Sequence, residues 1–206
     1  MSRVSGDPRP VHLELAWQGV GLESSFHATE DKQVVRDKVF RLIQNATFRA
    51  DFTIFEKSKT VVSRQSEEGL YKLAWFEHLR YVSPAIVKSK DELLVIAASI
   101  GTKKKRRLMK VAIEDVVTQT TMCANWEVAF WPAESDPMLQ IADYCTWAVQ
   151  RKWEVGDTRS YDLIRGKVAT EHDFFQDGTR HHYQERRDPQ RQLADLGRAQ
   201  GLFRRR

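Results

Sequence analysis

The chain has 206 residues, of which 41% are hydrophobic, and its ten Phe, six Trp and five Tyr supply enough apolar surface for a real core. This composition excludes a wholly disordered chain, and the length fits one domain, or one domain with a tail. The formal charge of +5 indicates an anionic partner without identifying it.

Composition also bears on where the protein resides. No apolar run approaches the roughly 20 residues that span a bilayer, and the N-terminus lacks the apolar centre of a signal peptide. The two cysteines, Cys123 and Cys145, form neither a disulfide framework nor a zinc-binding spacing. We therefore expect a cytoplasmic protein without a membrane partner.

The first part of the chain reads as two strands around one helix. Residues 1–10 are polar and are expected to be loose, and residues 11–16 alternate apolar and polar side chains as a strand does. Thr29 has a good N-cap side chain for a helix that ends near residues 45–47. Alternation over residues 48–54 predicts a half-buried strand.

Helices and strands then continue to alternate. A helix is predicted from about residue 66 to 82, with Pro84 as its end or a break. The continuous apolar run over residues 93–98 is typical of a strand covered on both faces. Residues 103–120 form the next predicted helix, and alternation around residues 126–130 predicts another strand.

The final segments complete the predicted layers. A helix begins at Pro137, and Asp157 or Thr158 caps a last helix that follows it. The whole order predicts an α/β layered domain over residues 11–175. From residue 176 the chain turns polar and Arg-rich, which predicts a flexible basic tail over residues 176–206.

One carboxylate stands out on the helix that begins at Pro137. The predicted apolar side of this helix carries Leu139, Ala142, Cys145, Thr146, Val149 and Trp153. Asp143 lies about 40° beyond Leu139, at the rim of that side. A carboxylate there needs a hydrogen bond, a cation or water, and metal-using enzymes place acids at such rims. The alternative is an Asp that is half exposed or bound to an Arg.

Five consecutive cations open the helix predicted over residues 103–120, namely Lys103, Lys104, Lys105, Arg106 and Arg107. Positive charge opposes the helix dipole at an N-terminus, and an anion bound there relieves the conflict. A phosphate-backbone contact is therefore one interpretation. A solvated charge run on an exposed face is the other.

Three further side chains carry open interpretations. His27, just before the first long helix, is a metal ligand or base, or else a cap or surface residue. His78 lies on an apolar face and is expected to be a hydrogen-bonded core histidine. Glu77, beside it, is expected to be a solvated charge.

Two motifs resemble a bacterial family, the domain-of-unknown-function family numbered 3800. The first is Leu139-Gln140-Ile141-Ala142-Asp143-Tyr144, followed about a dozen residues later by Gly156-Asp157. The second is Phe26-His27-Ala28-Thr29. The resemblance implies a ribonuclease-H-like fold, with a mixed sheet flanked by helices, and a role as a metal-dependent nuclease or nucleic-acid-processing domain.

The same resemblance implies site residues and a cofactor. In such folds a few acids hold Mg²⁺ or Mn²⁺, and the metal activates water. Asp143 would be the acid of the final helix and Asp136 a second ligand, with Glu23 and His27 as nearby polar contributors. The five cations of residues 103–107 would contact nucleic acid.

The chain departs from the family pattern in two places. The family opens with a strand that carries Asp-Glu-Ser, whereas Glu23-Ser24-Ser25 follows two glycines here. The family's middle strand ends in an acid, whereas residues 97–101 contain none. We therefore expect the first strand to be missing. The open alternatives are an active nuclease, a non-catalytic relic that binds nucleic acid or protein, and a truncated gene product.

Overall fold

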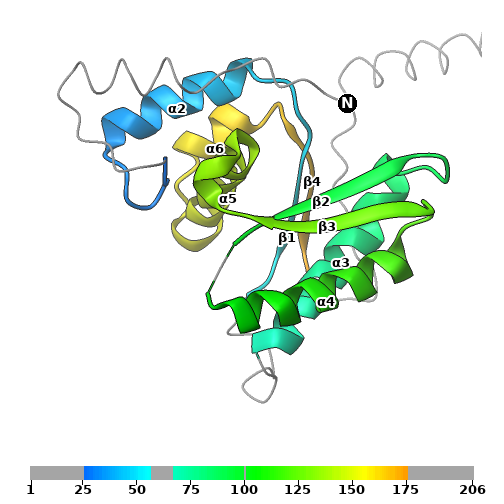
Figure 1. The fold of residues 1–206 in the computed structure, drawn as a ribbon. Helices are drawn as coiled ribbons and strands as arrows, with labels where there is room; N and C mark the ends of the chain where they lie inside the picture. Colours follow the sequence, from blue (N-terminus) through cyan, green and yellow to red (C-terminus); the bar gives the residue numbers. More distant parts are fainter. Residues whose placement is uncertain (1–25, 57–66, 100, 176–206) are drawn as a thin grey trace, which may run out of the picture.

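The computed structural model describes residues 26–56, 67–99 and 101–175, and these ranges form an α/β protein (Figure 1). The predicted strand over residues 11–16, Glu23 and the basic tail lie outside the described residues. Helices and strands alternate along the chain. In order they are α2 (Gln33–Asn45), β1 (Ala50–Ile54), α3 (Glu67–Ile86), β2 (Glu92–Ala98), α4 (Lys103–Thr120), β3 (Asn125–Trp131), the 3-10 turn η3 (Ala133–Ser135), α5 (Pro137–Val155), α6 (Arg159–Ile164) and β4 (Val168–Asp173).

The strands form two parallel pairs. β1 pairs with β4, with Ala50 opposite Val168, and β2 pairs with β3, with Val95 opposite Val128. Within the described ranges these are two separate two-stranded sheets, and each pairing is parallel. The α/β class predicted from the sequence is therefore confirmed, while a single mixed sheet is not what these strands form. The domain boundaries at residues 11 and 175 stay predictions.

Each strand pair belongs to its own hydrophobic core. The first core joins α2, α5 and α6 to β1 and β4, and Phe40, Tyr144 and Ile164 are among its fully buried side chains. The second core joins α3 and α4 to β2 and β3, around Ile113 and Val128. Parallel pairs need such crossover helices to connect them and to cover them.

Helix α3 contacts elements of both hydrophobic cores. Toward β1, the His78 Nδ1 atom lies 3.0 Å from the Thr53 hydroxyl. Toward β4, the Tyr81 ring lies 5.1 Å from the His172 ring, centroid to centroid. Toward α4, the Ser83 hydroxyl donates to the Thr120 carbonyl at 2.6 Å. The same helix therefore holds the two cores together.

Helix α2 begins later than the sequence predicts. Lys32 occupies the N-cap position of α2, and Thr29 lies in the turn before it, so the predicted cap is wrong. Residues 28–30 instead form a turn that Asp31 fixes, because its carboxylate accepts from the His27 N–H at 2.9 Å and from the Tyr144 hydroxyl. Tertiary contacts have overridden a local capping preference.

Two helix predictions need correction at their faces or ends. Helix α3 continues through Pro84 to Ile86, so the proline lies in the last turn and does not end the helix. The inward face of helix α5 is rotated from the predicted one, although Cys145 and Val149 are buried as predicted. Its buried residues are Gln140, Tyr144, Cys145, Ala148 and Val149, whereas Ala142 and Thr146 are exposed. Tyr144 sets this rotation, because it packs edge-on against Phe40 at 5.4 Å.

The strands hold two further differences. Strand β2 is not covered on both faces, since Leu94 is 51% exposed while its neighbour Val95 is buried. Strand β4 was not predicted at all. Its inward positions are Val168, Thr170 and His172, and two polar side chains among the three conceal the alternation that marks a strand. Among the described helices, none has the length and apolar character to cross a membrane.

Candidate functional site

The two motif segments meet at the start of α5. The Gln140 side-chain carbonyl accepts from the Phe26 N–H at 3.4 Å, and Asp143 Oδ2 accepts from the Ala28 N–H at 2.8 Å. Phe26 and Ala28 are both buried, so these bonds satisfy backbone donors that water cannot reach. The turn that carries His27 is therefore tied to α5 by side chains of α5 itself.

This arrangement brings His27 and Asp143 together. The His27 Nδ1 atom lies 3.5 Å from Asp143 Oδ2, and the two side chains are 50% and 37% exposed. Within the described residues, Asp143 Oδ1 and His27 Nε2 have no hydrogen-bond or ion-pair partner. The pair thus presents one carboxylate oxygen and one imidazole nitrogen to solvent.

Three residues around this pair were not predicted from the sequence. Asp31 binds both the His27 N–H and the Tyr144 hydroxyl. Burial, reinforced by the hydrogen bond to Asp31, raises the pKa of Tyr144 well above its ordinary value. Arg36 donates to the Ala28 carbonyl at 2.9 Å and lies 4.9 Å from the centre of the Trp147 ring. These contacts fix the turn through its backbone, which residue types alone do not reveal.

Asp136 has a structural role. Its Oδ1 accepts from the Met138 N–H at 2.6 Å, so it caps the N-terminus of α5, where Pro137 is the first residue. Asp136 precedes Asp143 by two helical turns, or about 10 Å of helix rise. The structure therefore does not bring the two predicted metal ligands onto one ion.

The described part of the chain offers few ligands for the predicted metal ion. No group of three or more His, Cys, Asp or Glu side chains there is placed to hold a metal ion. Magnesium in proteins often uses only one or two carboxylates and keeps several waters. The Asp143 carboxylate fits that limited role, whereas the His27 imidazole supplies no oxygen ligand. Glu23 lies outside the described residues, and its predicted contribution stays a prediction.

The five cations form the first turns of α4, as predicted. Thr102 caps this helix by accepting from the Lys105 N–H at 3.3 Å, and Arg106 donates to the Gly101 carbonyl at 2.7 Å. The first turn contains no acidic residue. Lys103, Lys104 and Arg107 are exposed, and within the described ranges no acid pairs with any of them. This concentrates uncompensated positive charge at one end of α4.

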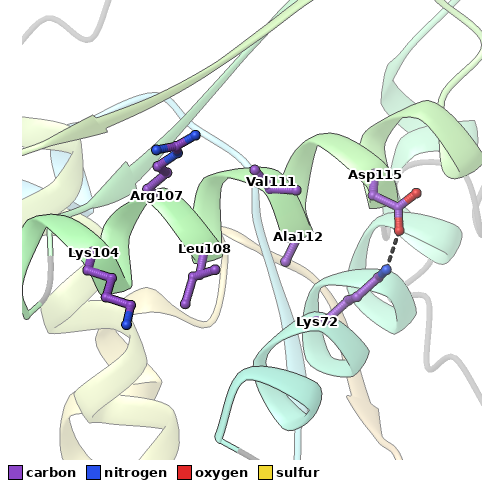
Figure 2. A pocket seen from close by; sticks show the side chains of 7 residues that line it. All are labelled: Lys72, Lys104, Arg107, Leu108, Val111, Ala112 and Asp115. Atoms are coloured by element: carbon purple, nitrogen blue, oxygen red, sulfur yellow. Dashed lines mark hydrogen bonds and ion pairs between the residues drawn. The ribbon is translucent and has the colours of Figure 1, made fainter.

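A hollow of about 650 Å³ lies between α3 and α4 (Figure 2). Its lining combines aliphatic and charged side chains, and the Lys72 ammonium binds the Asp115 carboxylate at one side. The lining residues are Lys72, Lys104, Arg107, Leu108, Val111, Ala112 and Asp115. The hollow is distinct from the His27 and Asp143 pair, which lies at α5.

Polar side chains are also buried where α3 meets β1. His78 is hydrogen-bonded to Thr53, as predicted, and burial lowers its pKa while Asp51 opposes this shift. Asp51 is itself bound by Arg49 and by the Thr170 hydroxyl, at 2.8 and 2.6 Å. The prediction that Glu77 is solvated is wrong, because this residue is only 7% exposed and lies 3.9 Å from Arg80.

Comparisons with known proteins give no independent assignment. No protein-family model, no curated protein and no solved structure matches the chain. The function of the chain is therefore inferred from its own residues and their contacts.

Proposed function

We propose that this protein is a nucleic-acid-processing α/β domain that binds the phosphate backbone through the first turns of α4. The observation that carries the proposal is the run of five cations, residues 103–107, without an acid in the first turn. The resemblance of two motifs to the ribonuclease-H-like family numbered 3800 supports it. The hydrogen bond from the Ala28 N–H to Asp143 brings the two motifs together in space.

The physical basis is a conflict that a phosphate removes. Backbone N–H groups at a helix N-terminus attract anions, whereas Lys103 and Lys104 place positive charge there at a cost of roughly 0.3–1 kcal/mol per charge. A phosphate would accept from the backbone and neutralise the lysines together. Release of counterions from the nucleic acid would add a salt-dependent gain.

Binding is tested by titrating fluorescent single-stranded and double-stranded DNA and RNA over a range of salt concentrations. The variant Lys103→Gln/Arg107→Gln removes two exposed charges, and its matched control is Lys88→Gln/Lys90→Gln, at the opposite end of β2. We expect the first variant to weaken binding for all sequences and to reduce the salt slope by about 2. Equal binding by the variant and the control would refute the proposed contact.

A metal-dependent cleavage activity is the second candidate, favoured by the uncommitted Asp143 Oδ1 beside His27. Asp143 and several waters would hold one Mg²⁺ or Mn²⁺ ion, which would supply Lewis-acid activation of water at a phosphodiester, and His27 beside it would serve as the base. The turn over residues 26–31 would fix the imidazole, because Asp31 binds the His27 backbone N–H. A domain that holds no such ion would correspond to the other alternative from the sequence, a non-catalytic relic that binds nucleic acid or protein.

Isothermal titration with Mn²⁺ separates these two candidates. Asp143→Asn keeps an oxygen that can accept from the Ala28 N–H, so it removes the charge with little effect on the fold. Asp162→Asn is the matched control, since Asp162 is exposed and accepts from the Thr158 hydroxyl. Micromolar binding that only Asp143→Asn abolishes supports a metal site. Absence of binding in the wild type assigns the non-catalytic role.

A further inference from the structure

Helix α4 exposes a row of four side chains spaced as in a coiled-coil seam. Lys104, Leu108, Val111 and Asp115 follow one another at intervals of four, three and four residues, which is the spacing of alternating d and a positions. Figure 2 shows them in order along the helix. Leu108 and Val111 are 44% and 57% exposed, so α4 leaves apolar surface uncovered here while its other side packs in the second core.

This row is complementary to itself when it is reversed. Lys104 and Asp115 are centred on the same point of α4 as Leu108 and Val111, between residues 109 and 110. An antiparallel copy of α4 that crosses at this point therefore sets Lys104 opposite Asp115, and Leu108 opposite Val111. Two-fold symmetry then repeats both contacts, as an isologous interface requires. Two apolar layers lie at the centre and one pair of opposite charges closes each end.

The flanking residues obey the same symmetry. Arg107 and Glu114 are seven residues apart and therefore lie on the same side of the row. In a two-fold symmetric pair, this side of one helix lies beside the same side of the other helix. An antiparallel pair therefore also sets Arg107 of each copy toward Glu114 of the other. Glu114 lies 3.8 Å from Lys110 in its own chain, and its side chain is 36% exposed. Asp115 binds Lys72 of its own chain yet stays 44% exposed, so its carboxylate can also bind a cation of the second copy.

We propose that the chain forms a homodimer through antiparallel pairing of α4 with α4 of a second copy. The partner is a second copy of this chain because α4 itself carries both the apolar residues and the opposite charges that the pairing requires. The hollow between α3 and α4 would receive side chains of that second helix. This inference does not rest on the proposed function, but it engages Lys104 and Arg107, which are also among the cations proposed to contact phosphate, so the dimer is measured without nucleic acid.

Sedimentation equilibrium without nucleic acid tests the pairing. We expect the wild type to approach twice 24.0 kDa with rising concentration, reversibly, as a small interface predicts. Leu108→Asp should remain a monomer, and Val34→Asp, at an equally exposed valine of α2, should not affect the mass. A wild type that stays monomeric up to about 1 mM would overturn the proposal and assign the row to another occupant.

A charge exchange tests the antiparallel register directly. Lys104→Glu alone sets two carboxylates together at each end of the row, and Asp115→Lys alone sets two ammonium groups together, so each variant should lose the dimer. When the two variants are mixed, a pair of unlike copies has opposite charges at both ends of the row, so a heterodimer should form. Recovery of the dimer only in the mixture supports the register. Homodimers of either variant, or no recovery on mixing, would refute it.

Discussion

The carboxylate of Asp143 accepts a hydrogen bond from the backbone N–H of Ala28 at 2.8 Å, although 115 residues separate them in the sequence. This bond joins the turn that carries His27 to the helix that carries the acid. It also means that Asp143 has a structural task in addition to any chemical one. The two tasks use different oxygens, because the bond occupies Oδ2 and leaves Oδ1 without a partner in the described residues.

Replacing Asp143 by alanine should destabilise the protein more than replacing it by asparagine. The Asp143→Ala variant leaves the buried Ala28 N–H without an acceptor, at a cost of about 1–3 kcal/mol, whereas Asp143→Asn retains a side-chain oxygen for it. Urea denaturation of both variants measures the difference. Equal losses of unfolding free energy would show that the bond contributes nothing beyond the charge.

The end of α5 allows a test of backbone strain alone. Gly156 has φ of 71°, and a Cβ added there would meet nothing within 4 Å. Gly156→Ala should therefore cost about 1 kcal/mol through strain only. Gly166 offers equal space at a φ outside the left-handed region, so Gly166→Ala is the matched control. Thermal unfolding should separate the two by a few degrees, and equal midpoints would contradict the expected strain.

Acid should weaken the contact between α3 and β1. Burial lowers the pKa of His78 in the folded protein below the value of about 6.5 in the unfolded chain, despite the opposing charge of Asp51. The unfolded chain therefore binds more protons as pH falls, so this stabilisation is complete above about pH 6.5 and declines below it.

The variant His78→Gln tests this pH dependence, since its amide can still bond to Thr53. We expect its unfolding free energy to fall less steeply below about pH 6.5 than that of the wild type. His27→Gln, at a half-exposed imidazole, serves as the control. A parallel pH profile for His78→Gln and the wild type would exclude this origin.

The thiols should resist modification in the folded protein. Burial raises the pKa of the Cys145 thiol to about 12, and Cys123 is buried as well. Because the thiolate is the reactive form, a disulfide reagent should modify both residues only as the chain opens. Addition of urea should accelerate the reaction. Rapid modification of either thiol under native conditions would contradict the burial of that cysteine.

The sequence predicted those elements whose core residues are apolar and periodic. Helix α4 spans the predicted residues 103–120, and β2 extends the predicted strand by one residue at its start. Strand β4 escaped prediction because Thr170 and His172 occupy its inward positions. These polar side chains are accommodated by Asp51 and by the ring of Tyr81, and neither partner is near in sequence.

The candidate site was predicted in part for the same reason. The motifs indicated His27 and Asp143, and the structure places them 3.5 Å apart. Gln140 and Asp31 were not identified, because they act on backbone N–H groups of residues 26 and 27, and such pairings leave no mark in residue type. Asp136 has the residue type of a ligand but serves as a helix cap.

The pairing of β1 with β4 constrains how the chain can be made. The Thr170 hydroxyl donates to Asp51, 119 residues earlier, and Val168 lies opposite Ala50 in the register. During synthesis, β1 must wait for nearly the whole described chain before its partner leaves the ribosome. The second core, whose elements lie between residues 67 and 131, can close earlier. The described part of the protein would therefore fold from its middle outward, with β1 paired after β2 although it is synthesised earlier.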